Sequence, residues 1–244
     1  MPMQMGVFLP DPSIREKAEG RPMQVLYFLH GMGGDYTTVC RFTSLERYLL
    51  DGQYNLAVVF PNAHRSFYSN MYHGEKYWDY ISREIPAFIR SYFNISTERK
   101  DTFLSGISMG GYGAMKLSLS FPERFSAVAV LSAALDAEKF AERSQNTPLS
   151  NEFKCIFGHS SAVNGSGSDL FHLAEKVASE KERPLIYQCC GTEDFLYDDN
   201  IKFREHLESL GLTHTYEESP GAHTWNYWDE NLKKALKFFP FEAF

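Results

Sequence analysis

One six-residue stretch constrains the fold of this chain more than any other. Residues 106–111 read GISMGG, which fits the pattern G-x-S-x-G. In that pattern a strand turns abruptly into a helix with a serine at the apex, and Gly106 and Gly110 keep side chains out of the crowded turn. The flanks agree, because residues 101–105 form a short β-prone run and residues 112–120 read as a helix. The pattern therefore predicts a strand–turn–helix unit that exposes Ser108 as a nucleophile beside a helix N-terminus.

Segments typical of strands and of helices alternate along the whole chain. Continuous apolar runs predict strands buried on both faces, and periodic runs predict helices. The expected strands are residues 24–29, 56–60, 101–105, 125–131, 185–190 and 213–218. The expected helices are residues 39–50, 77–93, 112–120, 200–210 and 225–239, with Pro86 bending the second or ending its first part. This alternation predicts an α/β fold, a mostly parallel central sheet with helices on both faces.

The chain has the length of one sizeable α/β domain. It holds 244 residues, 43% of them hydrophobic, and no repeat or composition break divides it. We therefore expect residues 1–244 to form a single domain. Residues 132–169 are less regular, and they are expected to be an insertion over the strand ends. The segment is either a small lid over the site or a surface excursion without a role in it.

Composition and charge argue against several classes of partner. The formal net charge of -7 leaves no basic surplus for binding a nucleic-acid backbone. No apolar run is long enough to cross a bilayer, and residues 1–6 show no pattern of a secretory signal. The four cysteines match no zinc pattern, so we expect free thiols, no metal site and a cytoplasmic location.

A serine nucleophile of this kind needs a carboxylate and a histidine from later in the chain, in that order. The carboxylate should follow the end of a strand, where open parallel sheets place their ligand sites. Asp194 fits, because it lies in the turn after the expected strand 185–190. Its role would be to accept the imidazole N–H and stabilise the imidazolium. The rivals are Glu193, expected to face solvent, and Asp198 and Asp199, which read as helix-capping residues.

His223 is the best candidate for the base. It follows Asp194 and stands in a loop between an expected strand and an expected helix, which can reach the end of the sheet. His206 and His214 also follow Asp194, but the first lies within a polar helix and the second begins a strand.

Two backbone N–H groups are needed to hold an oxyanion. One belongs to Met109, the residue after the nucleophile. The other should come from the glycine-rich turn at residues 29–35, where Met32 is the expected donor and His30 a loop organiser. A phosphate cradle is the alternative for this turn, but the lysine and spacing of a P-loop are missing.

Aromatic residues are numerous near these segments. They make up 15% of the chain, and Tyr68, Trp78, Phe195 and Trp225 are the candidates for substrate contact. The alternative for most such residues is that they fill the core and the helix faces.

Four motifs together resemble a known family. Residues 30–34, 106–113, 190–197 and 221–225 are similar, in this order, to the tributyrin esterase branch of the esterase D group. That group also contains S-formylglutathione hydrolases, feruloyl and acetylxylan esterases and mycolyltransferases, and the similarity covers nearly the whole chain. One departure is the N-terminus, because relatives start with a longer strand pair. The first edge strand is therefore expected to be missing or trimmed.

The resemblance implies an α/β-hydrolase fold, carboxylesterase activity on short acyl chains, no cofactor and a bacterial cytosolic setting. By motif match it implies the triad Ser108, Asp194 and His223, with Met32 and Met109 at the oxyanion hole. The expected function is hydrolysis of small-molecule short-chain esters, acylated sugars included, through an acyl-enzyme. Self-association into a small homo-oligomer is compatible with the resemblance. The alternatives are S-formylglutathione hydrolysis and a hydrolase-fold binding module without activity.

Overall fold

A computed structural model describes residues 2–244. One seven-stranded sheet lies at its centre, with the strand order β1-β3-β2-β4-β5-β6-β7. Every pair of neighbours is parallel except β1 and β3. The strands are β1 (Met5–Phe8), β2 (Gln24–Leu29), β3 (Leu56–Pro61), β4 (Thr102–Ile107), β5 (Ala127–Leu131), β6 (Leu185–Gly191) and β7 (His214–Ser219).

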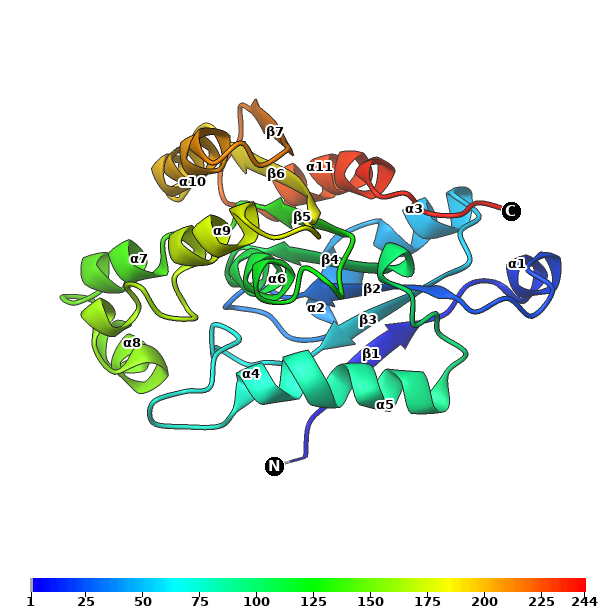
Figure 1. The fold of residues 1–244 in the computed structure, drawn as a ribbon, viewed down its shortest axis with the longest axis horizontal. Coiled ribbons are helices and arrows are strands. Elements are labelled where there is room, and N and C mark those ends of the chain that lie inside the picture. The colour runs from blue at the N-terminus through cyan, green and yellow to red at the C-terminus, as the bar shows by residue number, and fades with distance from the viewer. Residues whose placement is uncertain (1) are drawn as a thin grey trace.

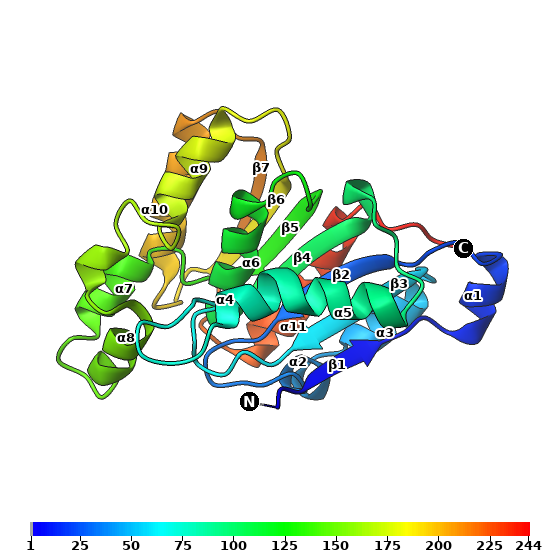
Figure 2. The same ribbon diagram turned by 60° about the horizontal axis from the view of Figure 1, so that its bottom comes forward.

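Helices cover both faces of this sheet (Figures 1 and 2). The α-helices are α1 (Pro12–Lys17), α2 (Thr38–Phe42), α3 (Leu45–Asp51), α4 (Tyr77–Asp79), α5 (Ile85–Tyr92), α6 (Met109–Ser120), α7 (Ala137–Arg143), α8 (Ser150–Phe157), α9 (Leu170–Ala178), α10 (Tyr197–Ser209) and α11 (Trp225–Phe238). The shorter turns are a π-helix, η1 (Tyr80–Glu84), and two 3₁₀ turns, η2 (Arg99–Asp101) and η3 (Ser160–Ala162). The predicted mostly parallel α/β architecture is therefore confirmed.

The core has two layers, one on each side of the sheet. On one side α5, α6, α9 and α10 bury apolar residues against the strands, and on the other α2, α3 and α11 do so. The central strands β2, β3 and β4 are buried along their full lengths, which explains why their sequences are continuous apolar or small runs instead of alternating ones.

Two predicted helices are built differently. The run at 39–50 is split into α2 and α3, because the extended backbone of Thr43 separates them. The run at 77–93 continues past Pro86, which stands in the first turn of α5. The π-helix η1 precedes it, and there the Ile85 N–H donates to the Tyr80 carbonyl five residues back. This wider turn accommodates a proline that cannot donate a hydrogen bond of its own.

The first edge strand was expected to be missing or trimmed, and the structure shows that it is not missing. β1 is present and pairs antiparallel with β3, with Met5 opposite Pro61 and Phe8 opposite Val58. Four residues are sufficient to cover the edge of β3, which is otherwise paired on its other side by β2.

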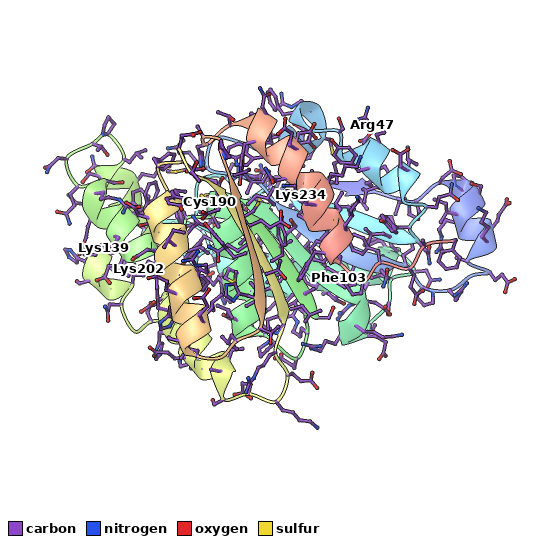
Figure 3. The ribbon with its side chains drawn as sticks, turned by 90° about the horizontal axis from the view of Figure 1, so that it is seen from above. Arg47, Phe103, Lys139, Cys190, Lys202 and Lys234 are labelled. Carbon is purple, nitrogen blue, oxygen red and sulfur yellow. The ribbon has the colours of Figure 1, made fainter. Side chains whose placement is uncertain are left out.

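The segment 132–169 forms α7, α8 and η3, which lie beside the sheet instead of across it (Figures 1 and 2). Two ion pairs tie it to α10. Lys202 Nζ lies 2.6 Å from Asp136 Oδ2, and the Arg143 guanidinium donates to both carboxylate oxygens of Asp199. Figure 3 shows Lys202 near Lys139 of α7, on the same side of the molecule.

Candidate active site

Ser108 stands alone between the last residue of β4 and the first residue of α6. Its backbone has φ 58° and ψ -119°, a strained conformation for a residue with a side chain. The neighbouring strand holds it there, because its N–H donates to the Leu131 carbonyl at 3.0 Å. Its own carbonyl accepts from the Ala134 N–H at 3.2 Å. Both ends of the strained residue are therefore fixed by backbone hydrogen bonds to the end of β5 and the turn after it.

The two glycines of the motif are required by close backbone contacts. A Cβ atom on Gly106 would lie 2.2 Å from the Gly110 carbonyl oxygen, and one on Gly110 would lie 2.0 Å from the Leu29 carbonyl oxygen. Backbone atoms held in a sheet and a helix cannot move aside, so no side chain fits at either position. The steric reason inferred from the sequence is thus present in the structure.

Three side chains from distant parts of the chain meet at this turn. His223, in the loop between β7 and α11, places Nε2 2.9 Å from Ser108 Oγ. Its Nδ1 lies 2.8 Å from Asp194 Oδ2 and 3.0 Å from Asp194 Oδ1. The neutral tautomer that satisfies both contacts donates Nδ1–H to the carboxylate and accepts the serine hydroxyl proton at Nε2. The geometry is that of a nucleophile, a base and an orienting carboxylate.

The carboxylate is buried, whereas the imidazole is accessible from one side. The Asp194 side chain is 0% exposed and the His223 side chain 19% exposed. Asp194 also accepts the Leu196 N–H at 2.9 Å, which fixes its orientation. The His223 ring packs against Phe195, with centroids 4.6 Å apart, and edge-on against Trp228 at 4.8 Å. These contacts restrict the imidazole to the orientation that reaches the serine.

Two backbone N–H groups border the same space. Met109 is the first residue of the twelve-residue helix α6, so its N–H is one of the helix-terminal donors. Met32 lies in the glycine-rich loop after β2, and both residues line the cavity above Ser108. Neither N–H has an acceptor within residues 2–244. Both are therefore available to a ligand.

His30 fixes the loop that carries Met32. Its Nε2 accepts the Ala63 N–H at 3.0 Å, which requires the proton on Nδ1, and Nδ1–H donates to the Gly31 carbonyl at 2.8 Å. Burial lowers the pKa of His30, so the neutral form is favoured. These hydrogen bonds make His30 a loop organiser, and its side chain does not line the cavity above Ser108.

A cavity of about 570 Å³ opens above Ser108 and has two contrasting walls. One wall is apolar and comes from the loop after β3, the turn after β5, α7 and the segments near them. Its side chains are those of Phe67, Ala134, Phe140, Leu149 and Phe195. The other wall is formed by α2 and the beginning of α11. Its side chains are those of Thr38, Arg41, Phe42, Trp225 and Trp228.

The rival acid and base candidates lie elsewhere. Glu193 and Asp198 are exposed, and Asp199 is buried in its pair with Arg143. His206 Nε2 lies 3.1 Å from the Phe171 carbonyl oxygen, and His214 begins β7. None of the five has a hydrogen bond to Ser108 or to Asp194 within the described chain.

Two of the four aromatic candidates line the cavity and two do not. Phe195 and Trp225 border it. Tyr68 is 0% exposed and donates its hydroxyl to the His30 carbonyl, so it is a core residue beneath the loop. Trp78 stacks on Phe121 at 5.7 Å and does not line the cavity. The expectation of substrate contact by Tyr68 and Trp78 is therefore corrected.

Sequence reasoning missed most of the cavity wall. Arg41, Phe42, Phe140 and Leu149 come from segments that have no motif of their own. One pattern could have identified the first two, because α2 follows directly after the glycine-rich loop and must begin beside it.

The part of the chain that the structure describes brings no three His, Cys, Asp or Glu side chains together as a metal site would. Over the same residues, no helix combines the length and hydropathy of a transmembrane span. Cys40, Cys155, Cys189 and Cys190 are free thiols, and Figure 3 shows Cys190 on β6.

Comparisons with known proteins agree with this geometry. The model of the family described as "Putative esterase" matches residues 1–239. An acetyl esterase of Caldicellulosiruptor saccharolyticus is 34% identical over 236 residues, which is 94% of this chain and 88% of that protein.

Two solved structures from Staphylococcus aureus are also similar. The fluorophosphonate-binding serine hydrolase FphF superposes with a TM-score of 0.88 at 35% identity, covering 98% of this chain and 92% of that one. The S-formylglutathione hydrolase FrmB superposes with a TM-score of 0.84 at 34% identity, covering 97% and 92%. The chain therefore belongs to this esterase family, within the esterase D and S-formylglutathione hydrolase group, and is a serine carboxylesterase of the α/β-hydrolase fold.

Proposed function

We propose that Ser108, His223 and Asp194 are the catalytic triad of this esterase. The observation that carries the proposal is the continuous hydrogen-bonded chain from the Ser108 hydroxyl through the imidazole to the buried carboxylate. His223 removes the hydroxyl proton as Ser108 Oγ attacks the ester carbonyl, and Asp194 stabilises the imidazolium that results.

The cycle has two halves. His223 gives its proton to the departing alcohol, which leaves an acyl group on Ser108, and water then repeats the sequence to release the acid. In each half the carbonyl oxygen becomes an oxyanion, which the free N–H groups of Met32 and Met109 stabilise. The positive end of α6 adds to this stabilisation.

The substrates we propose are small esters with short acyl groups. The apolar wall, with Phe67, Phe140 and Leu149, suits an acyl chain because it offers no hydrogen-bond donor. The cavity volume of about 570 Å³ must hold both acyl and alcohol parts, which favours short chains. The similar protein described as an acetyl esterase supports the same choice, and acylated sugars fall within the proposed class.

We propose that residues 1–244 act as one hydrolase domain in which the 132–169 insertion serves as a fixed wall. Phe140 and Leu149 of the insertion line the cavity. Its ion pairs to Lys202 and Asp199 of α10 hold it in place without covering Ser108.

The test is a panel of p-nitrophenyl acetate, butyrate and octanoate. The wild type should prefer the two shorter esters, and Ser108→Ala should lower kcat by about 10⁴-fold or more with unchanged thermal unfolding. Ser91→Ala is the matched control, because Ser91 is an exposed helix residue outside the site. Wild-type turnover retained in Ser108→Ala would refute the assignment.

A second candidate is S-formylglutathione hydrolysis. The similarity to FrmB favours it, since both reactions use the same triad on an ester or a thioester. The ratio of kcat/KM for S-formylglutathione to that for p-nitrophenyl acetate separates the two. We expect the oxygen ester to be preferred, and a preference for the thioester by tenfold or more would assign the second function.

Three further expectations stay predictions. They are a cytoplasmic location, assembly into a small homo-oligomer and the lack of a nucleic-acid partner.

A further inference from the structure

The cavity wall formed by α2 and α11 has a composition that ester hydrolysis alone does not explain. It combines one cation, Arg41, with two aromatic faces, Phe42 and Trp225. In the described chain, Arg41 is the sole charged side chain that lines the cavity beside the titratable His223. The protein as a whole has a net charge of -7, whereas this wall of the cavity carries a positive side chain.

The guanidinium of Arg41 has unused hydrogen-bond donors. Its side chain is 59% exposed, and Asp35 Oδ1 lies 4.0 Å away, beyond hydrogen-bond distance. Asp35 Oδ1 accepts the Thr37 N–H at 2.8 Å, the Thr37 hydroxyl at 2.6 Å and the Thr38 hydroxyl at 3.1 Å instead. Within residues 2–244 the guanidinium donates no hydrogen bond. Its planar donors are thus free for an anion at the cavity mouth.

Beside Arg41, two aromatic rings are stacked on each other. Phe42 and Trp225 stack with centroids 5.0 Å apart and planes 19° from parallel. Phe42 is 52% exposed and lines the cavity, so part of its ring is accessible to a ligand. A hydrogen bond connects the two segments that carry the stack. The N–H of Ser44, which follows α2, donates to the Asp229 carboxylate of α11 at 2.7 Å. Such pre-organisation lowers the entropy lost on binding.

The same surface leads to the base. Trp225 packs edge-on against Trp228 at 4.9 Å, and Trp228 packs edge-on against His223 at 4.8 Å. In the cycle proposed above, His223 protonates the departing alcohol, so the alcohol part of the ester must lie next to the imidazole. Phe195 of the apolar wall also packs against the imidazole, so both walls border the base. The apolar wall suits the acyl part, which leaves the α2 and α11 wall, with its cation, for the alcohol.

We propose that Arg41, Phe42 and Trp225 form a leaving-group subsite for esters whose alcohol carries a flat ring and a carboxylate. The ring packs against the exposed part of the Phe42 and Trp225 stack, and the carboxylate accepts the N–H groups of Arg41. Because the subsite serves ester hydrolysis, it depends on the function proposed above.

A matched pair of substrates tests this subsite. p-Acetoxybenzoate and its methyl ester have the same acyl group and the same ring, and only the first carries a charge on the alcohol side. Arg41→Gln should lower kcat/KM for p-acetoxybenzoate by roughly three- to tenfold, the size of one partly exposed ion pair. It should leave the methyl ester within about twofold, and Arg41→Lys should restore part of the loss. Added salt should shrink the difference between wild type and Arg41→Gln.

Two controls locate the effect. Arg47→Gln removes an exposed arginine on α3 that lies outside the cavity (Figure 3), and it should change neither ester. The p-nitrophenyl monoester of succinate carries its charge on the acyl side, and Arg41→Gln should leave its hydrolysis unaffected.

Phe42→Ala should lower kcat/KM for both aromatic esters relative to ethyl acetate.

These experiments distinguish a failure of the subsite proposal from a failure of the proposed esterase function. Equal losses on the charged and neutral esters, or a loss on the succinate monoester alone, would overturn the subsite while ester hydrolysis stood. A wild type that hydrolyses none of these esters, p-nitrophenyl acetate included, would instead overturn the proposed function.

Discussion

Ser108 shows how a strained residue is made stable by its neighbours. A side-chain-bearing residue at φ 58° and ψ -119° costs about 1–3 kcal/mol, which the surrounding hydrogen bonds must offset. The backbone of Leu131 and Ala134 fixes the turn, and Gly106 and Gly110 let the helix approach the sheet. The benefit is a partly accessible hydroxyl next to both the helix N-terminus and the imidazole.

Gly110→Ala should abolish activity and lower the stability of the native state. The new methyl group would meet the Leu29 carbonyl oxygen, so we expect a loss of about 3 kcal/mol or more in the free energy of unfolding. Urea unfolding measures this loss. Gly167→Ala is the control, because nothing lies within 4 Å of a Cβ there, and it should change stability by less than about 0.5 kcal/mol. Similar stabilities for the two variants would show that the contact at Gly110 is not limiting.

His30 should make the stability of the protein depend on pH. Burial lowers its pKa in the folded state, so below about pH 6.5 the unfolded chain binds a proton that the folded chain does not. Its contribution is therefore complete above about pH 6.5 and falls as the pH falls from there towards the folded pKa. We expect the free energy of unfolding of the wild type to decrease between about pH 7.5 and about pH 5.5.

His30→Asn isolates this effect, because the amide N–H can still donate to the Gly31 carbonyl but does not titrate. The variant should be less stable at about pH 7.5, with the Ala63 N–H left unpaired, and should show a smaller decrease on acidification. Equal pH slopes for wild type and variant would contradict this role.

At the residue scale, the sequence motifs were sufficient to predict Asp194 and His223 as partners of Ser108. They were not sufficient to predict which residues form the cavity walls. The order serine, aspartate, histidine predicted Asp194 and His223, which the structure brings within hydrogen-bond distance. Aromatic character alone could not separate Trp225, which borders the cavity, from the buried Tyr68. That difference depends on which loops meet in space, and no local pattern encodes it.

At the scale of elements, α6 connects the nucleophile to the rest of the core. It is buried along nearly its whole length and contains a buried lysine, Lys116. Lys116 Nζ donates to the hydroxyls of Ser69 and Ser168 and lies 4.5 Å from the Trp78 ring centroid, and it has no carboxylate partner in the described chain. Burial lowers the pKa of Lys116 to about 7.

Lys116→Met should therefore stabilise the protein at neutral pH. The folded pKa lies below the unfolded value of 10.5, so the contribution of Lys116 is complete only above 10.5 and falls as the pH decreases towards 7. Wild-type stability should rise by up to about 1.4 kcal/mol per pH unit between about pH 7 and pH 8.5, and the variant should lack this rise. At about pH 7 the variant should be more stable by roughly 1–3 kcal/mol.

Urea unfolding at several pH values measures both effects. Lys100→Met is the control, because Lys100 is exposed and should show neither change. A Lys116→Met variant that is less stable than the wild type and keeps its pH slope would show that the lysine is favourable as a charged hydrogen-bond donor.

The elements themselves divide into those that the sequence specifies locally and those that it does not. Buried parallel strands such as β2 and β3 are continuous apolar runs, and their predicted bounds agree with the structure within about one residue. The helices α7 and α8 of the insertion, and α9 directly after it, were not predicted, because short helices gain most of their stability from tertiary contacts. The ion pairs of Asp136 and Asp199 with side chains far along the chain are contacts of this kind.

At the scale of the whole molecule, the sheet is the frame on which all functional groups are placed. β2, β4, β6 and β7 are parallel and end at the same edge, so the segments after them carry Met32, Ser108, Asp194 and His223 to one place. This is why the topology predicted from the alternation of elements is already enough to bring the triad together. The insertion, α2, α11 and the loop after β3 contribute the side chains that line the cavity.

Labelling with a fluorophosphonate, followed by mass spectrometry of the peptides, tests the central claim most directly. A serine whose hydroxyl is activated by His223 should react with the phosphorus atom and leave one covalent adduct on Ser108. The account predicts a single adduct on Ser108 in the wild type and no adduct in the folded Ser108→Ala variant. A folded wild type that stays unlabelled, or an adduct on another residue while Ser108 stays free, would contradict it.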